Sequence, residues 1–149
     1  MRLHIRVTGR PAPQGSKKLG GAGQLLEESA YLPAWKAAVK IGCYKAYAAA
    51  GLTGDQIPLF TRTMPVHIEQ LTFLVDSVQC RADGTELPLG TPDVDKLLRA
   101  TLDALGGGRR DTARLFEDDS QIVRISDMSK QRPVGVRPGA IIIVSNEGV

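Results

Sequence analysis

One segment, residues 93–105, constrains the fold more than any other part of this sequence. Its apolar residues recur every three or four positions, which predicts a helix with one apolar side. Three glycines follow directly and predict the end of the helix, because glycine readily adopts the backbone conformation found there. An apolar side of this kind has to pack against a sheet or a second helix. The residues that form it are Val94, Leu97, Leu98, Leu102 and Leu105.

Four other segments predict the strands that this helix covers. Residues 2–8 alternate strictly between apolar and polar side chains, the pattern of a half-buried strand. A second helix is expected to begin near Pro33, which suits a first helical turn, and to end near Gly51. The three remaining strands are expected at residues 64–75, 120–126 and 140–145.

The resulting element order, β-α-β-α-β-β, predicts an α+β (mixed α/β) fold in which helices pack on a mixed sheet. The chain has 149 residues, the size of a single domain, so we expect residues 1–149 to form one domain. Hydrophobic residues make up 42% and charged residues 23%, which argues against a disordered chain. No apolar run is long enough for a membrane helix, and the first residues do not resemble a signal peptide. We therefore expect a cytoplasmic protein with no membrane partner, whose Cys43 and Cys80 are reduced thiols.

Basic residues are concentrated in the first third of the chain. Residues 1–45 carry eight Lys or Arg against two Glu, although the net charge of the whole chain is only +3. Such asymmetry favours a polyanionic partner. Lys17 and Lys18 fall within the glycine- and proline-rich residues 9–23, which we expect to form a long loop able to follow a nucleic-acid backbone.

Acidic residues cluster before and after the amphipathic helix. Asp93 and Asp95 flank its first residue, whereas Asp118 and Asp119 directly precede a predicted strand. If that strand lies beside the start of the helix, Asp119 approaches the first pair. Converging carboxylates repel one another and normally hold a cation, and a set of oxygen ligands without His or Cys favours Mg²⁺ or Mn²⁺.

Each of these residues also has a purely structural interpretation. Asp93 suits a helix N-cap, and the pair at 118–119 suits a solvated turn. Asp95, Arg99 and Asp103 are spaced four residues apart, so they form a charged line along the helix, and the first two suit an ordinary ion pair. The combination of D-x-D, helix, glycine stop, basic loop and D-D is more specific than any of its parts.

This combination, PDVDKLLRATLDAL followed by FEDDSQI, resembles the signature of the RusA-type Holliday-junction resolvases, small endodeoxyribonucleases often encoded by phages and prophages. The resemblance extends more loosely to the N-terminal strand, the G-x-P-x-P segment and the basic loop. It implies a dimeric mixed α/β protein that uses Mg²⁺ to resolve four-way DNA junctions by paired, symmetric nicks. It implies no small-molecule cofactor.

Carried over by position, the resemblance places the metal-binding and catalytic carboxylates on Asp93, Asp95 and Asp119, with Asp118 as an acidic neighbour of the metal. The family's helix lysine falls on Arg99, which keeps the positive charge but cannot readily lose a proton. The asparagine that usually follows D-x-D is Lys96 here.

The same resemblance, together with the basic residues, suggests where DNA is contacted. A homodimer is expected, because cutting two symmetric strands requires two active sites. A catalytically impaired protein that only binds junctions is an alternative that the changes at positions 99 and 96 permit, and a structural protein stabilised by a cation is another. The expected DNA-binding residues are Lys17, Lys18, Lys96, Arg109, Arg110 and Lys130.

Overall fold

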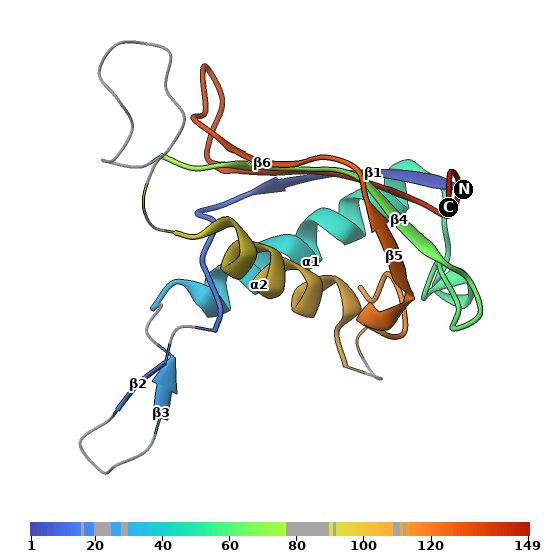
Figure 1. The fold of residues 1–149 in the computed structure, drawn as a ribbon. Coiled ribbons are helices and arrows are strands. Elements are labelled where there is room, and N and C mark those ends of the chain that lie inside the picture. Colours follow the sequence, from blue (N-terminus) through green and yellow to red (C-terminus); the bar gives the residue numbers. More distant parts are fainter. Residues whose placement is uncertain are drawn as a thin grey trace.

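A mixed β-sheet with two helices on one face forms the body of the molecule (Figure 1). The structure is a computed structural model that describes residues 1–15, 30–76, 90, 92–108, 111 and 113–149, and the backbone of residues 17–19 and 25–27. The predicted α+β class is confirmed by this arrangement. The five strands of the sheet are β1 (Arg2–Thr8), β4 (Val66–Leu74), β5 (Ile122–Ile125), β6 (Met128–Gln131) and β7 (Gly139–Ser145).

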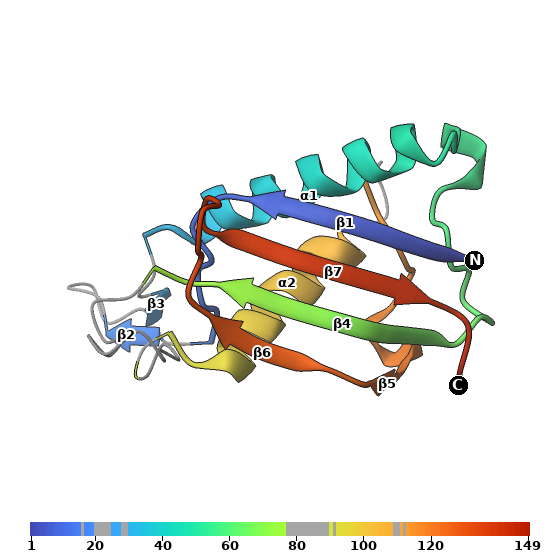
Figure 2. The same cartoon turned by 90° about the horizontal axis from the view of Figure 1, so that it is seen from above.

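The strand β7 lies between β1 and β4 and is antiparallel to both (Figure 2). Beyond β4, two short strands follow each other along the same edge and run parallel to it. The first, β5, pairs with the beginning of β4 at Val66–Ile68, and β6 pairs with its end at Leu71–Leu74. This edge carries the segment that joins the acidic residues at 118–119 to Lys130.

Two helices, α1 (Leu32–Ala49) and α2 (Val94–Gly106), cover the same face of the sheet (Figure 1). Pro33 lies in the first turn of α1, as its fixed φ predicts. Gly107 follows α2 with a φ of 55°, a backbone conformation that favours glycine. Short 3₁₀ helices form at η1 (Gly54–Gln56) and η2 (Asp119–Gln121). No helix within these described ranges is long and apolar enough to cross a lipid bilayer.

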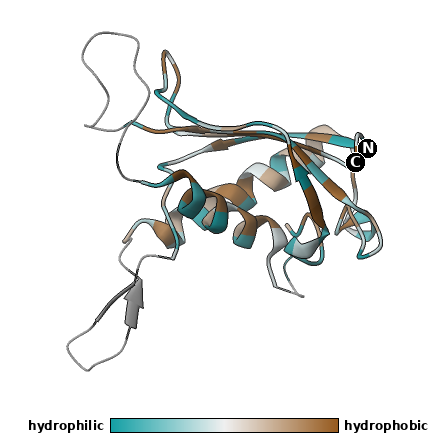
Figure 3. Ribbon diagram, viewed as in Figure 1, coloured by the Kyte–Doolittle hydropathy of each residue, from teal (hydrophilic) through white to brown (hydrophobic). Residues whose placement is uncertain are grey.

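The core lies between the sheet and the helices, and Trp35 of α1 is at its centre with 1% of its surface exposed. The indole Nε1 donates a hydrogen bond to Thr101 Oγ1 of α2 at 3.2 Å, and the same hydroxyl donates to the Leu97 carbonyl at 2.8 Å. The buried tryptophan therefore links the two helices through a polar contact that is fully paired. Figure 3 shows hydrophobic stretches along both helices and along the strands that they cover.

The buried side of α2 differs from the predicted one. Leu98 and Leu102, expected to face the core, are only partly buried. Three small residues of α2 are buried in their place, and one of them, Thr101, accepts the hydrogen bond from Trp35. The side chains that α2 buries are Leu97, Ala100, Thr101, Ala104 and Leu105.

Three short strands were not predicted. The expected loop at residues 9–23 includes β2 (Lys17–Leu19), which pairs antiparallel with β3 (Leu25–Glu27) as a separate two-stranded sheet. Each of these two strands is only three residues long, and Gly20, Gly21 and Gly23 lie between them in the sequence. The sequence pattern therefore does not distinguish them from a loop. The sequence of β6 is polar and has no apolar alternation, so only its pairing with β4 defines it as a strand.

Candidate active site

A cavity of about 330 Å³ follows the side of α2 that faces away from the core. Two of its lining residues are Leu98 and Leu102, the leucines that the core does not bury, and they give it an apolar part. The other lining residues are polar or charged and come from three separate segments of the chain. The described residues that line it are Gln14, Gly15, Asp95, Leu98, Arg99, Leu102, Asp103 and Asp119.

The two acidic segments meet at this cavity through one residue each. Asp95 comes from the first turn of α2, and Asp119 is the first residue of η2. Arg99 and Asp103 lie one and two helical turns beyond Asp95 and line the cavity as well. The charged line predicted along the helix is therefore the charged wall of the cavity. The ion pair suggested between Asp95 and Arg99 is not formed within the described part of the chain.

Asp93 does not line the cavity, contrary to the expectation that three or four carboxylates converge. It occupies the N-cap position of α2 with extended backbone, but its side chain makes no capping hydrogen bond. Its Oδ2 lies 3.5 Å from Lys96 Nζ, one turn along the helix. The described residues contain no group of three or more His, Cys, Asp or Glu side chains arranged to hold a metal ion.

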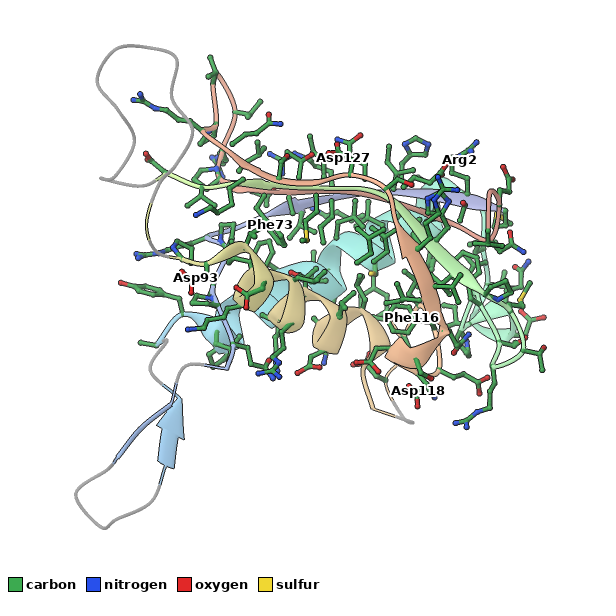
Figure 4. The ribbon with its side chains drawn as sticks, viewed as in Figure 1. Arg2, Phe73, Asp93, Phe116, Asp118 and Asp127 are labelled. Atoms are coloured by element: carbon green, nitrogen blue, oxygen red, sulfur yellow. The ribbon has the colours of Figure 1, made fainter. Side chains whose placement is uncertain are left out.

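Asp118 also has a local role and does not line the cavity. Its carboxylate accepts a hydrogen bond from the Ser120 amide at 2.9 Å and so caps η2. This hydrogen bond is the main reason why the pKa of Asp118 lies below its ordinary value. Figure 4 shows Asp93 at the start of α2 and Asp118 beyond the other end of the helix. Neither residue is among those that line the cavity.

A buried glutamine, Gln121, holds the second acidic segment in place. Its Oε1 accepts hydrogen bonds from the backbone amides of Glu117 and Asp118, both at 2.9 Å. Its Nε2 donates to the carbonyls of Thr61 at 2.9 Å and Met64 at 3.0 Å, and to that of Phe60 at 3.3 Å. The side chain thus joins the residues before η2 to the segment that precedes β4. This network fixes where Asp119 enters the cavity.

The loop that follows β1 forms a cradle for Arg99. Gly15 has a φ of 106°, and a Cβ built on it would lie 2.6 Å from Arg99 Nη1. Only glycine permits both this backbone conformation and this close approach. The neighbouring Gln14 amide donates to the Lys96 carbonyl at 3.1 Å, which ties the loop to the first turn of α2. The guanidinium has no hydrogen-bond or ion-pair partner among the described residues, so its donors are available to a ligand.

Gln14 also contacts Asp103 with its side chain. Its Nε2 donates to Asp103 Oδ2, and Lys36 Nζ of α1 lies 3.8 Å from the same oxygen. Asp103 is therefore engaged by two neighbours and helps to hold the loop against the helix. The other amide atom, Gln14 Oε1, is buried and has no hydrogen-bond partner in the described structure. A buried amide oxygen without a partner is unusual and marks a place where a donor or a cation is favoured.

The basic residues predicted to bind DNA have different surroundings in the structure. Lys96 does not line the cavity and is engaged with Asp93. Lys130 Nζ donates to two backbone carbonyls, those of Gly90 and Pro92. The backbone of Lys17 and Lys18 forms β2, but their side chains lie outside the described part of the structure, as do Arg109 and Arg110.

The cavity fits a small divalent cation with oxygen ligands. Mg²⁺ is usually held by one or two carboxylates together with water and substrate phosphate, and does not require a complete cage of protein ligands. Asp95 and Asp119 supply two carboxylates to the lining of one cavity. Neither His nor Cys lines it, so a softer ion such as Zn²⁺ is not favoured.

Three residues of the site were not predicted from the sequence. Gln14 and Gln121 are single amides without a motif, and their roles depend on contacts made with distant segments. Gly15 lies in a glycine-rich stretch where no one glycine is distinguished by the sequence. The capping box at η2 carries a weak signal, because Gln121 follows Asp118 by three residues. Comparison of the chain with protein-family models and with curated proteins found no match.

Proposed function

We propose that this protein is a metal-dependent endodeoxyribonuclease that cuts branched DNA, with four-way junctions as its preferred substrate. The observation that carries the proposal is the single cavity that Asp95, Asp119 and Arg99 line together. Two carboxylates able to hold a divalent ion, together with one cationic side chain, can support hydrolysis of a phosphodiester. The preference for junctions rests on the resemblance of the D-x-D and D-D segments to the RusA-type resolvases.

In the proposed reaction, the oxygen of a water molecule attacks phosphorus, the bond to one bridging oxygen breaks, and that oxygen leaves with a proton. A bound Mg²⁺ or Mn²⁺ supplies charge neutralisation and a more acidic water. Asp95 and Asp119 are the residues that would hold the ion. An ion held there would take its remaining ligands from water and from the substrate phosphate.

Arg99 is proposed to bind the non-bridging oxygens of the scissile phosphate. Its planar guanidinium can donate two parallel hydrogen bonds to a phosphate, and these strengthen as negative charge develops in the transition state. A guanidinium group acts through charge and geometry and not as an acid or base. Gly15 positions this guanidinium against the loop.

DNA binding is proposed to involve the basic first third of the chain, including Lys17 and Lys18, together with Arg109 and Arg110. Each phosphate that such a side chain neutralises releases counterions, so the affinity for DNA should fall steeply with added salt. Paired nicks on opposite strands require two cavities related by a two-fold axis, and a homodimer is therefore part of the proposal.

A junction-binding protein with impaired catalysis is the second candidate. The specific observation that favours it is the engagement of Asp93 by Lys96, which leaves two carboxylates and not three at the cavity. An exposed ion pair of this kind contributes only about 0–1 kcal/mol. It does not lock Asp93 in place, so we rank the nuclease first.

The proposal is tested by incubating the protein with a synthetic four-way junction and with a linear duplex of the same arm sequence, with EDTA, Mg²⁺ or Mn²⁺. We expect paired nicks near the branch point of the junction, only with a divalent ion. Tight binding of the junction without cleavage in either ion would support the second candidate. Equal cleavage of the linear duplex would contradict the preference for junctions.

A further inference from the structure

The side chain of Lys130 is hydrogen-bonded to the chain segment that leads into α2. From its position on β6, its Nζ donates hydrogen bonds to the Gly90 and Pro92 carbonyls, both at 2.9 Å. Pro92 directly precedes Asp93, the N-cap residue of the helix. Two of the three donors of the ammonium group are therefore used by backbone that lies beside the D-x-D segment.

This contact is not explained by the stability of the helix. The N-terminus of a helix carries a partial positive charge, so a lysine placed near it is electrostatically unfavourable. The two carbonyls that accept its hydrogen bonds offset that cost. Gly90 has a φ of 79°, which marks a turn in the chain just before the helix. The two hydrogen bonds from Lys130 therefore hold the chain at the turn before α2 and do not cap the helix itself.

The same first turn of α2 is held from a second direction. The Gln14 amide donates to the Lys96 carbonyl at 3.1 Å, and within the helix the Leu97 amide donates to the Asp93 carbonyl at 3.0 Å. Lys130 anchors the entry to the helix on the sheet edge, and Gln14 anchors its first turn on the N-terminal loop. Asp95 lies between these two anchors and lines the cavity.

We propose that Lys130 is a positioning residue, which holds the turn before α2 so that Asp95 faces the cavity. This inference rests on the proposed function and replaces the expectation that Lys130 binds the DNA backbone. The hydrogen bonds from an ammonium group to carbonyls are stronger than neutral ones, so two of them can fix the turn.

The direct test is hydrogen exchange in the free protein carrying Lys130→Met, which keeps the aliphatic stem and removes the donors. We expect the Leu97 amide, in the first turn, to exchange about tenfold faster or more. The Gly107 amide, which donates to Asp103 O at the other end of the same helix, should be unaffected. The matched control is Lys45→Met at an exposed position of α1, which should change neither rate.

A second readout separates positioning from DNA contact. In Lys130→Met we expect the Mn²⁺ concentration that half-saturates cleavage to rise about tenfold or more, within the range measured for residues that support metal ligands. The salt dependence of junction binding should stay the same, because no phosphate contact is lost. Lys130→Arg, which keeps a cationic donor, should restore part of the Mn²⁺ response.

The outcomes distinguish this inference from the proposed function. Unchanged exchange at Leu97, or a flatter salt dependence in Lys130→Met, would overturn the positioning role even if the wild-type protein cuts junctions. Faster exchange at Leu97 in a protein that cuts no DNA would support the positioning role and remove the proposed function.

Discussion

The two aspartate pairs of this protein, 93/95 and 118/119, differ in sequence context but have the same division between a local and a cavity-lining residue. In each pair the first residue has a local role and the second lines the cavity. Asp93 is paired with Lys96, and Asp118 caps η2. Asp95 and Asp119 reach the same cavity. Two neighbouring aspartates are therefore not equivalent, because the backbone that carries them decides which carboxylate lines the cavity.

The two aspartate pairs are also held in place by different kinds of side chain. The segment before Asp93 is anchored by the charged side chain of Lys130, which donates to two exposed or partly buried carbonyls. The segment around Asp118 is anchored by the neutral, buried Gln121, which both accepts and donates. A buried amide with all its hydrogen bonds made gives a more rigid support than a partly exposed ammonium group. We therefore expect the second pair to be the better ordered one.

The largest effect is expected from the carboxylates at the cavity. Asp95→Asn and Asp119→Asn should each reduce junction cleavage about a hundredfold or more, because each removes a charged ligand from the proposed ion. Both variants should keep their fold, since the two residues are exposed. Asp93→Asn should have an intermediate effect, and Asp118→Asn the smallest. Cleavage rates at saturating Mg²⁺ measure the series, and equal losses in all four variants would contradict the division within each pair.

Gln121→Leu should have the next largest effect, on both stability and cleavage. It leaves partly buried backbone groups at Asp118 and Thr61 without partners, which should lower the free energy of unfolding by about 1–3 kcal/mol. Denaturant titration measures this loss. The matched control is Gln56→Leu, because Gln56 accepts from the Thr53 amide in a similar capping box but is exposed. A loss of the same size in both variants would show that Gln121 acts only as a cap.

A smaller effect is expected from Gly15→Ala, which introduces backbone strain and displaces Arg99. We expect a loss of about 1–3 kcal/mol in stability and a fall in cleavage of about tenfold through misplacement of the guanidinium. Gly51→Ala is the control, since Gly51 also has a positive φ but nothing lies near its added Cβ. Cleavage that falls no further in Gly15→Ala than in Gly51→Ala would show that the cradle does not position Arg99.

The smallest effect concerns pH. Because the Ser120 hydrogen bond lowers the pKa of Asp118 in the folded protein, its contribution to stability is complete above the ordinary carboxyl range. It is lost as the pH falls through the lowered pKa. The stability of wild type relative to Asp118→Ala should therefore shrink between neutral pH and pH values below about 4. An advantage that is constant over this range in denaturant titrations would contradict the capping role.

Most of the fold, but only part of the cavity, could be predicted from the sequence. Hydrophobic periodicity placed both large helices and four strands, and the spacing of Asp95, Arg99 and Asp103 predicted the charged line that borders the cavity. Periodicity did not reveal that Leu98 and Leu102 leave the core, because burial of the smaller Ala and Thr residues depends on how closely two helices approach. It could not show which aspartate of each pair lines the cavity, since this depends on contacts between distant segments.

Asp95 and Asp119 are proposed to bind a divalent cation in the cavity that both residues line. The most direct measurement is a Mn²⁺ titration followed by electron paramagnetic resonance, with wild type, Asp95→Asn, Asp119→Asn and Asp118→Asn compared at the same protein concentration. The account predicts that the same bound-ion signal is lost in both cavity variants and kept in Asp118→Asn. Retention of the signal in Asp95→Asn or in Asp119→Asn would contradict it.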